Sequence, residues 1–120
     1  MGNIIARSSL RRKFDLLFKM ATSYNNKYDN EFAILLTKMD KNAIDPKGGN
    51  SVVMILILSG NEVYACHAIK EGFTLRGVNN NFESAFDLAT NSKMNKVVTL
   101  INSYTNSRHF TGNRTYNTFF

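Results

Sequence analysis

Residues 51–61 read SVVMILILSGN, in which seven consecutive apolar residues separate a serine from a turn-forming Ser-Gly-Asn triplet. Unbroken apolarity and β-branched side chains are typical of a buried strand. The chain contains no obvious partner for such a strand, however, and a single unpaired strand is not stable. Ser51 is also a favourable residue for the start of a helix. We therefore predict a helix over residues 52–58 that is buried on nearly every side.

The pattern around this segment recurs 33 residues later in the chain. Residues 49–56 read GNSVVMIL and residues 82–89 read FESAFDLA, which aligns Ser51 with Ser84 and keeps most apolar positions in phase. A constant period of this length indicates a repeat architecture, in which each unit buries its apolar face only against its neighbours. An inner helix of such an array is packed from both sides, which explains an apolar run without a polar face.

Five further helices are predicted from apolar residues at helical spacing and from capping or turn residues at the segment ends. They cover approximately residues 10–23, 32–41, 62–71, 84–90 and 95–104. In the fourth helix of the chain, the apolar side is assigned to Val63, Ile69 and either Cys66 or His67. The strongest turn signal is DPKGGN at residues 45–50.

The predicted fold class is all-α, with short helices joined in pairs by tight polar turns. The expected organisation is a flexible basic arm at residues 1–9, a helical repeat domain at residues 10–104 and a polar, aromatic-containing tail at residues 105–120.

The repeated segments resemble the ankyrin repeat, whose first helix carries a T-P-L-H-x-A pattern. Residues 84–89 read SAFDLA and keep the hydroxyl cap, an apolar residue at the leucine position and the alanine. Residues 51–56 keep the cap and the apolar positions but have leucine instead of alanine. Gly60-Asn61 stands at the family's inter-helix turn, and Gly72 stands where the family has a glycine after the second helix. The family's proline and histidine are missing, and Phe82 replaces an expected turn glycine.

The resemblance covers residues 10–104 and implies a short solenoid of two to three repeats, made of paired antiparallel helices with an N-terminal capping helix pair. It also implies a non-catalytic module that binds and modulates a partner protein with its turn tips and the exposed ends of its inner helices. At matching positions, the partner-binding candidates are Lys47, Gly48, Asn50, Leu58, Ser59, Glu71, Asn80, Asn81, Glu83, Asn91, Ser92 and Tyr104. Leu58 is the most informative of them, because an exposed apolar side chain at a variable position suits an interface.

The far end of the last repeat, near residues 97–101, must also be covered in such an array. The aromatic residues of the tail are one expected cover, and a homodimer through this end is the other. These tail residues are Phe110, Tyr116, Phe119 and Phe120.

Residues suited to catalysis or to metal binding are sparse. Cys66 and His67 are adjacent, which on a helix points them about 100° apart rather than toward each other. Two histidines and one cysteine do not provide the four convergent ligands of a zinc site. The glycines of residues 45–50 match no phosphate-loop or dinucleotide pattern, and the carboxylates are scattered. We therefore predict no enzymatic activity, no cofactor and no metal.

Positive charge supports a second hypothesis, a small basic helical regulator that binds nucleic acid. The formal net charge is +6, and charge of this size steers a protein toward nucleic acid, anionic lipid or an acidic protein. The same charge is also a common route to solubility. Basic residues near the amino end include Arg7, Arg11, Arg12 and Lys13. Gly2, together with this basic segment, raises the further alternative of N-myristoylation, although Ala6 replaces the usual serine or threonine.

Composition also bears on compartment and source. A single cysteine excludes an intramolecular disulfide and is typical of a reducing interior. The start of the chain lacks the apolar stretch of a signal peptide, and residues 52–58 are too short to span a bilayer. We therefore expect a cytoplasmic protein. The asparagine bias suits an AT-rich genome such as that of a virus, a phage or an intracellular bacterium.

Overall fold

The computed structural model describes residues 2–23 and 26–109, with side chains described over 9–23 and 26–105. Over these residues the chain is helical, which confirms the predicted all-α class. The helices are α1 (Gly2–Ala21), α2 (Asp29–Thr37), α3 (Val52–Leu58), α4 (Glu62–Lys70), α5 (Ala85–Asn91) and α6 (Asn95–His109).

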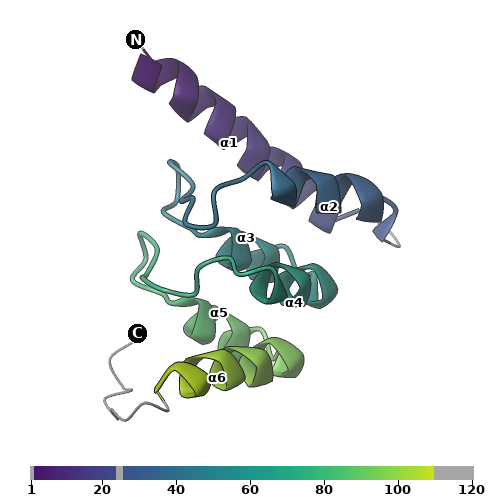
Figure 1. Ribbon diagram of the computed structural model, residues 1–120, viewed down its shortest axis with the longest axis vertical. Coiled ribbons are helices and arrows are strands. Elements are labelled where there is room, and N and C mark those ends of the chain that lie inside the picture. Colours follow the sequence, from purple (N-terminus) through teal and green to yellow (C-terminus); the bar gives the residue numbers. More distant parts are fainter. Residues whose placement is uncertain (1, 24–25, 110–120) are drawn as a thin grey trace.

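The helices are arranged as three consecutive pairs stacked in layers (Figure 1). α1 and α2 form the first layer, α3 and α4 the second, and α5 and α6 the third. Within each layer the two helices contact each other. Between layers, α3 contacts both α1 and α5, and α4 contacts α6. α3 is therefore enclosed by helices from all three layers.

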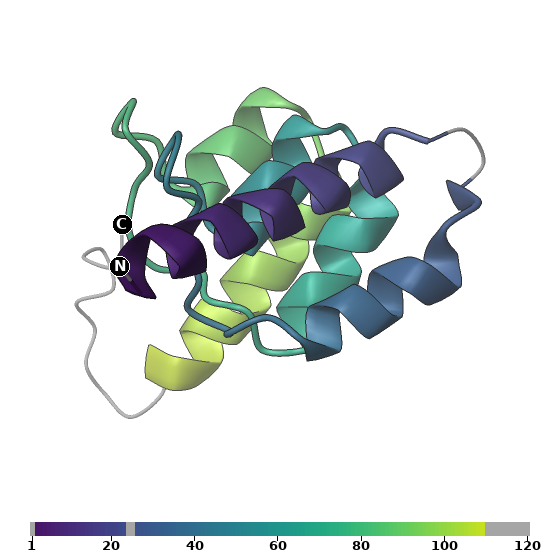
Figure 2. The same ribbon diagram turned by 90° about the horizontal axis from the view of Figure 1, so that it is seen from above.

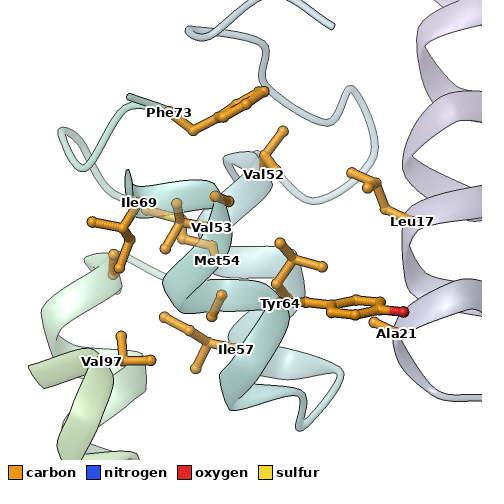
Figure 3. Close-up of a cluster of buried hydrophobic side chains, with 14 of the residues drawn as sticks. Leu17, Ala21, Val52, Val53, Met54, Ile57, Tyr64, Ile69, Phe73 and Val97 are labelled. Atoms are coloured by element: carbon orange, nitrogen blue, oxygen red, sulfur yellow. The ribbon is translucent and has the colours of Figure 1, made fainter. Parts of the chain in front are cut away.

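This enclosure explains the apolar run of α3. Val53 and Leu56 are completely inaccessible to solvent, and Val52, Met54 and Ile57 are each 1% exposed. Figure 3 shows Val52, Val53, Met54 and Ile57 of α3 among side chains from the neighbouring parts of the chain. The prediction of a helix rather than a strand over residues 52–58 is confirmed, because packing from both neighbours removes the need for a polar face.

Both inner helices of the second and third layers begin at the predicted serine caps. Ser51 Oγ accepts a hydrogen bond from the backbone N–H of Met54 at 3.2 Å. Ser84 Oγ accepts one from the N–H of Asp87 at 3.0 Å, and the Asp87 carboxylate accepts from the N–H of Ser84 at 3.0 Å. Such reciprocal caps satisfy amide donors that the first turn of a helix leaves without a partner.

Backbone conformation repeats with the same period as the sequence. Gly49 has a φ of 75° and Phe82 a φ of 62°, while Gly60 has a φ of 81° and Lys93 a φ of 57°. Each pair of positions lies 33 residues apart. The third layer therefore adopts, with a phenylalanine and a lysine, the left-handed conformation that glycine adopts in the second layer at less cost.

Replacing Phe82 by glycine is expected to stabilise the protein. The side chain is 84% exposed, so its removal loses little buried apolar area. Glycine also adopts the left-handed backbone conformation of residue 82 without strain. After allowing for the greater freedom of glycine in the unfolded chain, we expect the free energy of unfolding to rise by about 0.5–1 kcal/mol. Urea denaturation measures this change. Val78→Gly is the control, because Val78 is also an exposed apolar loop residue but has no positive φ. An equal gain in both variants would show that strain at residue 82 is not the cause.

The bounds of three helices differ from the prediction by more than two residues. α2 spans Asp29–Thr37, where residues 32–41 were expected. α1 begins at Gly2, so residues 2–9 continue the helix where an arm was expected. No glycine or proline interrupts the chain between Asn3 and Leu10, and helix propagation is therefore not blocked. α6 continues to His109, five residues beyond the predicted end of the repeat domain. The predicted tail aromatics, from Phe110 onward, lie outside the described residues.

The predicted apolar side of α4 is partly wrong. Val63 is 64% exposed, His67 faces outward and Cys66 is only partly buried, whereas Ile69 is buried as predicted. The buried face instead contains Tyr64, Ala65, Ala68 and Ile69. Tertiary packing selected this face because α2, α3 and α6 approach α4 from that side.

Polar and aromatic contacts join the first layer to the second. Asn61, the N-cap of α4, is buried and donates from Nδ2 to the carbonyl of Ala21 at 3.0 Å and to Asn26 Oδ1 at 2.8 Å. The Tyr64 hydroxyl donates to Asp29 Oδ1 at 2.7 Å. Burial, followed by this hydrogen bond to a carboxylate, raises the pKa of Tyr64 well above its ordinary value. The phenol therefore remains a donor at all physiological pH values.

At the far end of the stack, Val97 and Ile101 are buried within the core. Figure 3 shows Val97 pointing toward Ile57 and Ile69 of the second layer. These two side chains of the last helix thus point inward. The expectation that the tail or a second copy covers this end of the array stays a prediction.

Candidate interaction surface

A short loop that folds back on itself precedes α3. Its organising residue is Asp45, whose N–H donates to the carbonyl of Asn50 at 2.8 Å. The Asp45 carboxylate accepts hydrogen bonds from the N–H groups of Lys47 at 3.0 Å and Gly48 at 3.3 Å. Because Asp45 is only 8% exposed, it holds the loop from inside and leaves Lys47 at the surface.

The loop before α5 is built in the same way around Asn79. The side-chain oxygen of Asn79 accepts hydrogen bonds from the N–H groups of Asn81 at 2.9 Å and Glu83 at 3.0 Å, and Asn79 is 5% exposed. Neither Asp45 nor Asn79 was predicted as a site residue. The signal that could have identified them is an aspartate or asparagine at the start of both turn segments.

Hydrogen bonds join the two loops to each other. The N–H of Asn80 donates to the carbonyl of Gly48 at 3.0 Å, and its side-chain amide lies 3.4 Å from the carbonyl of Lys47. Asn79 Nδ2 donates to Asn50 Oδ1 at 2.9 Å. Figure 1 shows the two loops projecting together from one side of the stack. We call this area the loop-tip surface; it contains Lys47, Gly48, Asn50, Asn80, Asn81 and Glu83.

The loop-tip surface thus unites half of the predicted partner-binding residues, although they come from two segments of the chain. The other predicted residues lie elsewhere. Leu58 and Ser59 are at the carboxyl end of α3, and Asn91 and Ser92 at that of α5. A seven-residue helix rises roughly 10 Å, and this length separates these ends from the helix starts to which the loops lead. Leu58 is 48% exposed, in agreement with its predicted exposure.

Two predicted residues belong to the outer helices. Glu71 follows α4, and its carboxylate lies 3.9 Å from His67 Nε2. Tyr104 is on α6 and is 39% exposed. The structure therefore divides the predicted residues among the loop tips, the ends of the inner helices and the outer helices.

Phe82 is a residue of the loop tips that sequence reasoning did not include among the binding candidates. It is 84% exposed, more than any other large apolar side chain among the described residues. It lies in the loop between Asn81 and Glu83 and has a left-handed backbone. The available signal was the aromatic residue at a position where a glycine was expected.

Cys66 and His67 are neighbours on α4 and share no hydrogen bond. Cys66 is partly buried, and desolvation, followed by the nearby charge of Glu62, raises the pKa of its thiol. The thiol is therefore protonated at neutral pH and is a poor nucleophile. His67 instead packs edge-on against Phe32, with ring centroids 5.6 Å apart. Over the described side chains, no group of three or more histidine, cysteine, aspartate or glutamate residues could hold a metal ion.

Among the helices of the described ranges, none has the length and apolar character needed to cross a bilayer. Compared with protein-family models, curated proteins and solved structures, the chain shows no significant match to any of them.

Proposed function

We propose that this protein is a non-catalytic module for protein–protein interaction, built as a short ankyrin-like solenoid with α1 and α2 as its capping pair. The 33-residue recurrence supports this arrangement, since capping serines and left-handed residues return at the same interval. The layered helix pairs and the loops on one side of the stack are consistent with it (Figure 1). The cytoplasm is the proposed compartment, in keeping with a single unpaired cysteine.

The observation that carries the proposal is the joining of the two loop tips by hydrogen bonds. Because their backbones are already ordered, a partner that binds there pays little for ordering them. The joined tips present the lysine of residue 47, the amide of residue 81 and the aromatic ring of Phe82 to solvent. An exposed aromatic side chain among polar groups is typical of binding hot spots.

A loop-tip variant tests this function. Lys47→Ala, Asn81→Ala and Phe82→Gly are combined, and proteins captured from a cell extract are quantified by mass spectrometry against the wild type. The matched control is Lys19→Ala combined with Asn102→Ala and Val78→Gly, which leaves all three tip positions intact. We expect the loop-tip variant to lose at least tenfold in affinity for the captured partner, about 1.4 kcal/mol, and the control to retain it. Equal capture by both variants would contradict the proposal.

A second candidate, nucleic-acid binding, is favoured by lysine and arginine side chains that do not pair with carboxylates. Over residues 9–23 and 26–105, no lysine or arginine lies within ion-pair distance of an aspartate or glutamate. Several carboxylates instead accept hydrogen bonds from the chain, as Asp45 and Asp87 do. Arg11, Arg12 and Lys19 are exposed on α1 and are free to contact phosphates. Binding of DNA and RNA is measured with the same purified proteins over a range of salt concentrations. This function would be favoured if the affinity falls steeply with salt and is lost in Arg11→Glu/Arg12→Glu.

A further inference from the structure

A groove runs between the outer helices α4 and α6, away from the loop tips. In Figure 2, the loops before α3 and α5 project from one side of these two inner helices, and the outer helices α4 and α6 lie on another side. The groove has a volume of about 660 Å³, within the usual range for binding sites. Its apolar wall comes from Val63 and Cys66 of α4 and from Leu100 of α6.

The apolar wall is partly exposed to solvent. Val63 is 64% exposed, although neighbouring positions of α4 such as Tyr64 and Ala65 are fully packed. Cys66 and Leu100 are only partly buried and border the core without belonging to it. A partner that covers Val63, Cys66 and Leu100 would remove their apolar area from water, which favours binding.

The charges along the groove favour an acidic occupant. Lys70 at the carboxyl end of α4 and Lys96 in the first turn of α6 both line it, and neither has a carboxylate within ion-pair distance. Glu62 is the only carboxylate among the lining residues. Its Oε2 accepts a hydrogen bond from the backbone N–H of Lys96 at 2.9 Å, so the amino end of α6 offsets part of its charge, although the rest still raises the pKa of Cys66. With two lysines against this one carboxylate, the lining keeps a net positive charge.

We propose that the groove between α4 and α6 binds an acidic amphipathic helix of a partner protein. The apolar side of that helix covers Val63, Cys66 and Leu100, and its carboxylates pair with Lys70 and Lys96. Two side-by-side helices present ridges and grooves into which a third helix packs, and such helix-in-groove recognition uses apolar anchors one turn apart. This surface is distinct from the loop-tip surface and its occupant does not depend on the loop tips.

The single cysteine of the chain provides a direct reporter of occupancy, because Cys66 lines the groove. Random 16-residue peptides are displayed and selected for binding to the full chain, with counter-selection against Val63→Asp. Val63 is exposed and lies in the first turn of α4, where an acidic residue is favourable, so this variant is expected to fold. Circular dichroism and thermal unfolding verify this, and Val78→Asp is the matched control.

We expect the selected peptides to carry aspartate or glutamate beside apolar residues spaced three and four apart, and to slow maleimide labelling of Cys66 at least tenfold. Their affinity should fall about tenfold in Lys70→Gln/Lys96→Gln. It should remain unchanged in Val78→Asp and in Lys38→Gln/Arg76→Gln, which removes two exposed positive charges outside the groove. The proposal is overturned if no peptide survives counter-selection, if the peptides lack acidic residues or if Cys66 labels at its free rate. Protection of Cys66 that rises with protein concentration alone would assign the groove to a second copy and also overturn it. Loss of the partner captured from the cell extract in the loop-tip variant would bear on the proposed function and not on this groove.

Discussion

Replacing Asn61 by alanine is expected to lower the free energy of unfolding by about 3 kcal/mol, a large part of the total for a small domain. The side chain is 8% exposed and makes three hydrogen bonds. Its Oδ1 caps α4 by accepting from the N–H of Tyr64 at 2.9 Å, which alone contributes about 1 kcal/mol. Its Nδ2 donates to the buried carbonyl of Ala21 and to the partly buried side chain of Asn26, and alanine leaves both acceptors without that donor.

Equilibrium denaturation in urea measures this effect, with Asn102→Ala as the control. Asn102 is an exposed residue of α6, and its replacement is expected to change stability by less than about 0.5 kcal/mol. Hydrogen exchange adds a second readout, because the amides of α1 and α2 should lose protection before those of α5 and α6. If Asn61→Ala and Asn102→Ala unfold at the same urea concentration, these hydrogen bonds do not stabilise the junction of the first two layers.

Replacing Gly49 by alanine is expected to cost about 2–3 kcal/mol, through two separate effects. Gly49 has a φ of 75°, which an alanine adopts only at a cost of about 1 kcal/mol. An added Cβ would also lie 2.5 Å from Asn80 Oδ1 and 3.1 Å from the backbone nitrogen of Asn80. To relieve this contact, the Asn80 side chain must rotate and its backbone nitrogen must shift by a few tenths of an ångström, which weakens the hydrogen bonds of Asn80 to Lys47 and Gly48.

Gly60→Ala separates the two effects. Gly60 has a φ of 81°, but an added Cβ would meet no atom within 4 Å, so this variant reports the backbone cost alone. We expect Gly60→Ala to lose about 1 kcal/mol and Gly49→Ala to lose distinctly more. Asn80→Ala should recover part of the difference in the Gly49→Ala background, because it removes the nearest atom. Equal losses in Gly49→Ala and Gly60→Ala would mean that the loops are not packed together in solution.

Asn61 is also an example of a residue whose role could not be predicted from the repeat pattern. Residue 94 is the counterpart of Asn61 in the third layer, and it is a buried methionine. The repeat alignment therefore indicates that the position is buried but not that Asn61 must be an amide. That requirement comes from the turn between α1 and α2, which places the carbonyl of Ala21 and the side chain of Asn26 beside it.

The sequence by itself determined the helical class, the helix over residues 52–58 and the caps at Ser51 and Ser84. These features depend on residues a few positions apart along the chain, where helix periodicity and capping hydrogen bonds operate. Only the tertiary structure decided that Val63 faces outward, that Asn80 joins the loop tips and that α4 and α6 leave a groove between them. Each of these depends on which side chains of a distant helix or loop cover a surface, and the 33-residue period does not specify those individual contacts.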